Sequence, residues 1–276
     1  MYCSISRESR PNKTIPGHWV KNPPPKKRGN MKVKRSFGWV PDRPDQRDYL
    51  YSAIRPVVRL PKKVDLREFC SEVENQEELG SCTANALAGN LEYLDHKIDD
   101  EYEDVSRLFI YYNERVLEGT VDYDSGASLR DGIKTLRKQG ACWEKTWPYL
   151  IERFDRKPPK NCYIEAKKHC IESYHRINSL PEMLTCLAEG YPFVFGFTVY
   201  ESFQSQRVAK TGVANMPRKK EKTLGGHAVL AVGYNQREKR FLVRNSWGSQ
   251  WGKDGYFTMP YEYLETLSAD FWTIRR

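Results

Sequence analysis

NQEELGSCTANALAGNLEYLDHKI, residues 75–98, decides the fold, because it joins a tight turn to the start of a helix. Gly80 permits a close turn of the backbone, and Ser81 is a suitable N-cap residue. Apolar residues then recur at helical spacing, at Ala84, Leu87, Leu91, Leu94 and Ile98. This spacing predicts a helix over 82–98, with Cys82 in its first turn.

The position of Cys82 suits a nucleophile. The free N–H groups and the dipole at a helix start favour an anion, so we expect the pKa of this thiol to be lowered. Gln76, six residues earlier, could direct its amide N–H₂ at an oxyanion formed beside the sulfur. A cysteine after Gly-Ser is also often a small buried hydrophobe, so this position alone leaves both interpretations open.

Two later segments could supply partners for the thiol. His227 begins the apolar strand HAVLAVGYN, and Asn245 ends another strand, two residues before Trp247. The asparagine could orient the imidazole, and the indole could shield their hydrogen bond from water. His227 follows Cys82 by 145 residues and precedes Asn245 by 18. This order and this spacing are close to those of papain-type enzymes.

Together these residues resemble the papain-like cysteine peptidases, from about Leu60 to the C-terminus. NQEELGSC, GGHAVLAVGY and NSWGSQWGKDGY match the family's cysteine, histidine and asparagine segments. The bacterial and large-virus branches are more similar than the animal cathepsins. Two positions depart from the family pattern, because Thr83 stands where tryptophan is usual and Leu79 where a disulfide cysteine is usual.

The resemblance implies an α+β fold of two lobes, a helical left lobe and a β-barrel-like right lobe with the active-site cleft between them. It also implies an endopeptidase that forms a thioester on Cys82, with His227 as acid and base. Asn245 would orient His227, and Gln76 would stabilise the oxyanion. The residues implied for substrate binding are Ser125, Gly126, Ala127, Gly196, Ala228 and Trp247. No metal or organic cofactor is expected.

Two alternatives use the same residues. The first is another thiol acyl transfer on this fold, transglutamination or deamidation, which differs only in what resolves the thioester. The second is a catalytically silent binding protein, for which Thr83 and the unusual N-terminal segment are the hints. Both remain open at the level of sequence.

The N-terminal segment, residues 1–59, differs from the rest of the chain. Residues 1–60 contain 14 Lys and Arg against 4 Asp and Glu, whereas the other 216 residues contain 31 against 32. The excess charge is therefore confined to this segment, which makes nucleic-acid binding by the body an unlikely function. We expect residues 1–35 to be extended or disordered. FGWVPDRPDQRDYLY, residues 37–51, could dock on the body.

The segment is interpreted either as a solvated tail or as a propeptide that occupies the cleft, which would make the chain a zymogen. The lobes are expected at residues 60–158 and 159–276, with the last residues crossing back to the first lobe. The partner of the active enzyme would be a protein or peptide substrate.

Further helices are predicted over 128–139, stopped by Gly140, and over 161–176. Strands are predicted over 191–200, 227–235, 240–248 and 255–260.

Neither a secretory signal nor an apolar stretch long enough to span a membrane is found, so a cytoplasmic location is the default expectation. The seven cysteines show no metal-site spacing, so a zinc site is not expected, and mostly reduced thiols are predicted.

Overall fold

The computed structural model describes residues 35–54 and 59–276, which belong to one compact unit beginning at residue 34. The prediction of an extended or disordered tail therefore falls on residues outside the described part, apart from Arg35. Within the two described ranges, no helix combines the length and the apolar character needed to cross a membrane.

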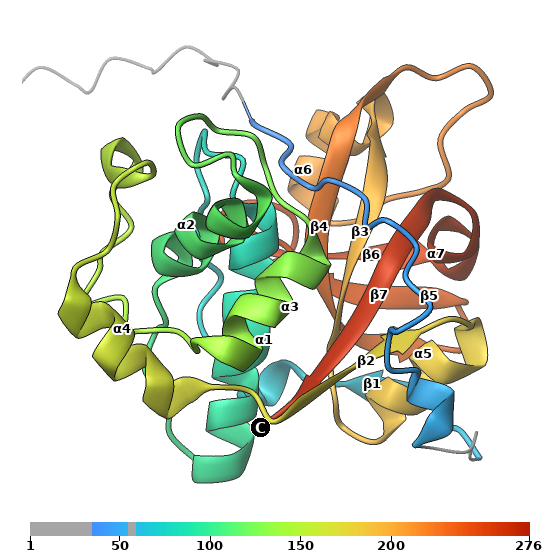
Figure 1. Ribbon diagram of the computed structural model, residues 1–276. Coiled ribbons are helices and arrows are strands. Elements are labelled where there is room, and N and C mark those ends of the chain that lie inside the picture. Colours follow the sequence, from blue (N-terminus) through green and yellow to red (C-terminus); the bar gives the residue numbers. More distant parts are fainter. Residues whose placement is uncertain (1–34, 55–58) are drawn as a thin grey trace, which may run out of the picture. The chain divides into compact units, whose positions relative to one another are not determined.

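Three helices form one side of this unit (Figure 1), namely α1 (Cys82–Asp99), α2 (Arg107–Glu118) and α3 (Leu129–Lys138). The helices predicted over 82–98 and 128–139 are confirmed. The polypeptide leaves α3 through Gly140, whose φ of 76° lies in the left-handed region that favours glycine. The helices share an apolar core with one face of a sheet, and we call this side the helical lobe.

A seven-stranded sheet forms the other side, which we call the sheet lobe. Its hydrogen-bonded order is β2-β7-β3-β4-β5-β6, with β1 paired to β4, and all these pairings are antiparallel. The strands are β1 (Lys63–Asp65), β2 (Ser173–Ile177), β3 (Phe193–Tyr200), β4 (Thr223–Asn235), β5 (Arg240–Arg244), β6 (Tyr256–Pro260) and β7 (Ser268–Arg275).

Alternation along β3 and β4 divides the interior into two cores. Val194, Ala228 and Leu230 belong to the core shared with the helices, whereas Phe195 and Val229 belong to the core inside the sheet lobe. This two-residue period follows from the strand geometry, in which successive side chains point to opposite faces. The central strand β4 therefore joins both lobes.

Four shorter helices complete the described part: α4 (Lys160–Ala166), α5 (Leu180–Ala188), α6 (Gln206–Thr211) and α7 (Tyr261–Leu267). The helix predicted over 161–176 is wrong beyond Ala166. A 3-10 turn follows, and Ser173–Ile177 then pairs with β7. The pairing partner lies about a hundred residues further along the chain, so local periodicity could not reveal it.

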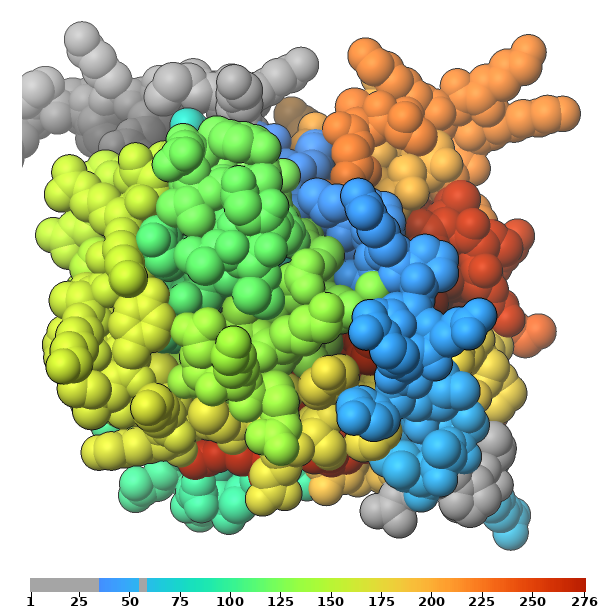
Figure 2. Space-filling model, viewed as in Figure 1, coloured from blue at the N-terminus to red at the C-terminus, as the bar shows by residue number. Residues whose placement is uncertain are grey.

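Residues 35–48, here called the covering segment, cross the molecule where the helices meet the sheet. Figure 1 draws this stretch in blue in front of the sheet, and in Figure 2 its atoms lie between the green helical lobe and the red and orange sheet lobe. The buried indole of Trp39 belongs to the helical core. The prediction that residues 37–51 dock on the body is confirmed.

Candidate active site

Cys82 is the first residue of α1 and is fully buried. Ser81 stands at the N-cap position, but its side chain makes no capping bond and instead hydrogen bonds to the Tyr149 hydroxyl at 2.6 Å. The backbone N–H groups of Ala228 and Gly38 act on the sulfur and favour its thiolate form. Ala228 follows His227 directly, so the thiol at the start of α1 lies against the part of β4 that carries the predicted histidine.

The His227 ring is held by its neighbours on the sheet lobe. Its Nε2 lies 2.8 Å from Oδ1 of Asn245, which can only accept, so this nitrogen carries the proton. The Trp247 ring stacks on the imidazole with 4.8 Å between centroids. Nδ1 is buried and has no hydrogen-bond partner in the described part of the chain. The unprotonated Nδ1 of neutral His227 is therefore available to take a proton.

Gln76 is fixed beside the cysteine by several hydrogen bonds. Its Oε1 accepts from the Ser246 hydroxyl at 2.6 Å, and its Nε2 donates to the Leu79 carbonyl at 2.9 Å. Nε2 also donates to the carbonyl of Ser36 at 3.4 Å. The same amide hydrogen could donate to an oxyanion if the covering segment moved away.

Burial opposes charge on both central groups. Removal from water raises the pKa of Cys82 to about 11, despite the favourable backbone N–H groups. Burial also lowers the pKa of His227 to about 4, although the bond to Asn245 works in the opposite direction. The prediction of a lowered thiol pKa is wrong for this state, because desolvation outweighs the helix start. Neutral thiol and neutral imidazole are the stable forms beneath the covering segment.

The covering segment forms β-type hydrogen bonds on both lobes. The Trp39 N–H donates to the Gly226 carbonyl at 3.1 Å, and the Val40 N–H donates to the Ala127 carbonyl at 2.9 Å. The Ala127 N–H in turn donates to the Gly38 carbonyl at 2.7 Å. The segment therefore bridges the lobes directly above the thiol.

Small residues make this close approach possible. A Cβ atom on Gly196 would overlap the Trp39 indole, and one on Gly126 would overlap the Gly38 carbonyl. Three residues expected to bind substrate, Gly126, Ala127 and Gly196, thus contact the covering segment. Ala228 lies against the sulfur and Trp247 against His227. Ser125 differs, since its hydroxyl donates to the Gly126 carbonyl and hydrogen bonds to the Thr120 hydroxyl within its own loop.

Two residues at this site, Asp124 and Phe37, were not predicted from the sequence. Asp124 accepts from the Gly80 N–H with both carboxylate oxygens at 3.0 Å. It therefore links the loop of the predicted substrate-binding residues 125–127 to the turn before Cys82. Phe37 contacts His227 edge to face, with 6.3 Å between centroids. Asp124 directly precedes the predicted substrate-binding residues Ser125, Gly126 and Ala127, but no local pattern signals that Phe37 lies at the histidine.

An ionic cluster holds the far end of the covering segment. Asp48 pairs with Arg130 of α3 at 2.6 Å, and the Asp42 carboxylate accepts from the Trp272 indole N–H at 2.8 Å. The Asp42 N–H donates to Asp270 at 2.8 Å. Burial and the nearby Asp270 carboxylate raise the pKa of Asp42 to about 6. These contacts attach the segment to both lobes.

A thiol at a helix start, an imidazole oriented by an amide and a further amide donor beside the sulfur define a cysteine hydrolase. Residues 60–267 match the sequence model of a family described as "papain family cysteine protease". The chain belongs to the papain family and is a papain-like cysteine peptidase, as the resemblance of its motifs predicted.

Two relatives belong to the branches that the motifs favoured. An uncharacterized peptidase C1-like protein of Acanthamoeba polyphaga mimivirus is 43% identical over 273 residues, covering 88% of each chain. The crystal structure of xylellain, a cysteine protease from Xylella fastidiosa, matches with a TM-score of 0.81 and 43% identity, covering 88% of this chain and 96% of that one.

The fold is shared more widely than the sequence. The structure of bromelain from Ananas comosus matches with a TM-score of 0.62 at 21% identity, covering 78% of this chain and 99% of that one. This likeness concerns the fold alone. Together with xylellain it confirms the predicted α+β papain-like fold of two lobes.

Proposed function

We propose that Cys82 is the nucleophile of this cysteine endopeptidase and His227 its acid and base. Nδ1 of His227 would take the thiol proton, the thiolate would attack a peptide carbonyl, and the imidazolium would protonate the leaving amine. A water deprotonated by the same ring would then hydrolyse the thioester. The observation that carries this proposal is the 2.8 Å contact between Nε2 of His227 and Oδ1 of Asn245, because an oxygen that only accepts leaves Nδ1 as the acceptor of the thiol proton.

The oxyanion would be stabilised by the Cys82 N–H and by Nε2 of Gln76. Support comes from the hydrogen bond that Ser246 donates to Oε1 of Gln76, because it leaves the N–H₂ end as a donor, which now reaches the Leu79 and Ser36 carbonyls. A preorganised donor of this kind contributes about 3–4 kcal/mol to transition-state stabilisation.

Substrate would bind where the covering segment now lies. The Gly226 and Ala127 carbonyls would accept from its backbone, and the space between Gly196 and Ala127 would hold a side chain on the acyl side of the cut. The leaving side of the substrate would then pass over His227 and Trp247, since His227 protonates the amine there. Ser125 would hold Gly126 in place through the hydrogen bond from its hydroxyl to the Gly126 carbonyl.

We also infer that residues 1–59 are a removable pro-segment whose covering part keeps the peptidase latent. Trp39 bridges to Ala127 in parallel orientation, and Arg35 lies over Trp247 with 4.3 Å to the ring centroid. The covering segment therefore runs from the leaving side towards the acyl side, opposite to the proposed substrate. Its scissile bonds would be presented in the wrong direction, which explains how it could bind without being cut.

The proposed lobe boundaries, residues 60–158 and 159–276, place Cys82 and Gln76 in the first lobe and His227 and Asn245 in the second. The interface of the lobes would then be the catalytic centre. A substrate bound across it would contact both.

Hydrolysis of a peptide library tests the proposal, on the full-length protein carrying Trp39→Ala to loosen the covering segment, with Cys82→Ala in the same background as control. Mass spectrometry would identify new termini in the presence of a primary amine. Cleavage that disappears in the variant supports the peptidase mechanism. Products that incorporate the amine without cleavage would instead assign transglutamination.

A further inference from the structure

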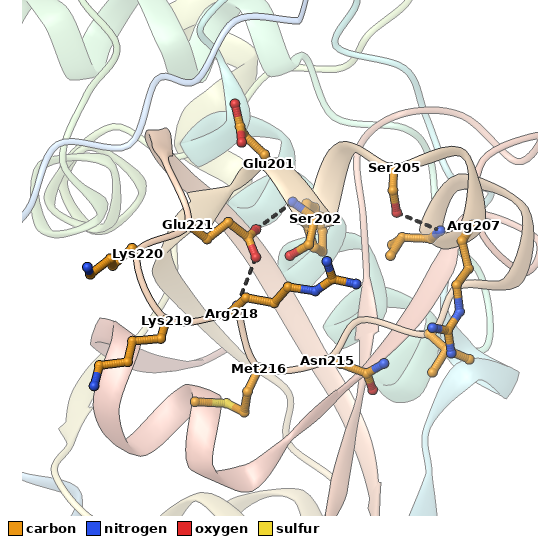
Figure 3. Close-up of a pocket in the computed structure, with 13 residues that line it drawn as sticks. Glu201, Ser202, Ser205, Arg207, Asn215, Met216, Arg218, Lys219, Lys220 and Glu221 are labelled. Carbon is orange, nitrogen blue, oxygen red and sulfur yellow. Dashed lines mark hydrogen bonds between the residues drawn. The ribbon is translucent and has the colours of Figure 1, made fainter.

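A hollow of about 640 Å³ lies on the sheet lobe, beyond the residues discussed so far. It is bounded by the 3-10 helix Glu201–Gln204, by α6 and by the loop over residues 213–221 (Figure 3). Its apolar lining comes from Phe203, Val208, Val213 and Met216. A surface hollow with an apolar lining and a charged rim is suited to bind a peptide.

The charge on its rim is mainly positive and mostly unpaired. In Figure 3 the side chain of Arg218 extends towards the side on which Arg207 stands, whereas Lys219 and Lys220 point away. Neither guanidinium forms a hydrogen bond or salt bridge in the described part of the chain. Glu221, the nearest carboxylate, instead accepts from the backbone N–H groups of Ser202 at 2.6 Å and Arg218 at 2.8 Å.

The hollow is connected to the catalytic centre through aromatic rings. The Phe203 ring contacts Trp247 at 5.6 Å between centroids, and Trp247 stacks on His227. Two ring contacts span roughly 10 Å, which an extended chain covers in about three residues at about 3.3 Å each. Arg35, which lies over Trp247, shows that a polypeptide can follow this surface.

We propose that this hollow selects peptide substrates with acidic side chains at the second to fourth residues after the scissile bond. The inference rests on the proposed function, in which the leaving side passes over His227 and Trp247. Arg207 and Arg218 would bind the carboxylates, and guanidinium groups suit this role because they offer paired donors in a fixed plane. Glu201 and Glu221 on the same rim are the carboxylates that would oppose an acidic ligand, and Glu221 already accepts from two backbone N–H groups.

Two peptides that differ only in Glu or Gln at these three positions test the inference on the full-length protein carrying Trp39→Ala, in which the covering segment is loosened. An aliquot of each preparation is first titrated with an irreversible epoxide thiol inhibitor to count the reactive sites. A failure of the peptidase mechanism would then appear as missing titratable sites. The Glu peptide should show about a tenfold higher kcat/KM at low salt, mainly through KM. The preference should shrink at 1 M salt, because these charges are exposed.

Variants at matched positions locate the effect. The double variant Arg207→Gln, Arg218→Gln should lose the preference, whereas Lys219→Gln, Lys220→Gln removes the same charge and should keep most of it. The chain without these rim substitutions could instead hydrolyse both peptides equally while a separate aliquot shows that all its active sites react with the inhibitor. That result would overturn the inference and leave the peptidase mechanism intact. Equal losses of the preference for the Glu peptide in the two double variants would also overturn the inference. Such a result would mean that the preference depends on the net charge of the loop and not on Arg207 and Arg218.

Discussion

The backbone N–H of Trp39 donates to the carbonyl of Gly226, the residue directly before His227. The Trp39 indole also packs so closely on Gly196 and Gly226 that neither could carry a Cβ atom without overlap. One residue of the covering segment thus blocks the backbone acceptor and the side-chain space that a substrate would need. The accessibility of Cys82 should depend on how tightly Trp39 is held.

The variant Trp39→Ala should expose the thiol. Loss of a buried tryptophan costs about 3–5 kcal/mol, so the covering segment should detach more often and alkylation of Cys82 should be at least tenfold faster. The rate of iodoacetamide labelling, followed by intact mass, measures this.

The neighbouring variant Val40→Ala is the matched control, because Val40 is 43% exposed and its backbone hydrogen bond is retained. It should label at nearly the original rate. Equal rates for Trp39→Ala and the unmodified chain would show that the segment does not protect the thiol.

The variant Gln76→Ala should lower kcat about 10²- to 10³-fold with little change in KM, because an oxyanion donor acts mainly in the transition state. Steady-state kinetics on a fluorogenic peptide measure both constants. Ser246→Ala removes only the hydroxyl that orients Oε1 of Gln76, so its loss should be smaller, about tenfold. A raised KM with unchanged kcat in Gln76→Ala would assign the amide to ground-state binding.

The variant Asn245→Ala should reduce kcat/KM by about 10²-fold, since an imidazole without its orienting partner is misplaced for proton transfer. The bond to Asn245 raises the pKa of His227, so its loss lowers that pKa further and disfavours the imidazolium. Thiol alkylation at neutral pH should therefore slow as well. Unchanged alkylation and hydrolysis would exclude Asn245 from the mechanism.

The free energy of unfolding should vary with pH because the pKa of Asp42 is raised in the folded chain. A carboxyl whose pKa rises from 3.8 to about 6 on folding stabilises the fold below pH 4, and this contribution is lost as the pH rises through 6. Asp42→Asn removes the charge and can still accept from Trp272. It should match the parent near pH 4 and exceed it by up to about 3 kcal/mol at pH 8.

Thermal unfolding at the two pH values measures this difference, and the expected gain in Tm at pH 8 is a few degrees. Asp45→Asn is a suitable comparison, because among the described residues Asp45 pairs only with Arg47, two residues away. The Asp42 carboxylate also lies 3.6 Å from the guanidinium of Arg176, and a destabilised Asp42→Asn protein at pH 8 would mean that this ion pair outweighs the burial of Asp42.

Local patterns predicted those parts of the fold that depend on local sequence. The helix over 82–98 could be predicted because its apolar face repeats every three to four residues, and Gly140 because a helix needs a C-terminal stop. By contrast, β2 and β7 were missed, since each is stabilised by pairing with a strand distant in sequence. Gly89 within α1 is explained only by Arg244, which leaves no room for a larger side chain.

The active-site residues could be named from motifs, but their protonation states could not. The pKa of Cys82 depends on burial, which raises it, and on the backbone N–H groups of Ala228 and Gly38, which lower it and come from distant segments. A helix start alone predicts the opposite shift. Likewise, Arg207 and Arg218 are unremarkable in sequence and become neighbours of one hollow only when the loop folds over α6.

The most direct test is a labelling experiment with an irreversible epoxide thiol inhibitor on the full-length protein carrying Trp39→Ala, in which the covering segment is loosened. The labelled residue is mapped by mass spectrometry, and peptide hydrolysis is followed in the same samples. We expect label on Cys82 alone and a loss of hydrolysis in proportion to it, with neither label nor hydrolysis in Cys82→Ala. Hydrolysis that persists when Cys82 is fully labelled, or in the Cys82→Ala protein, would contradict the account.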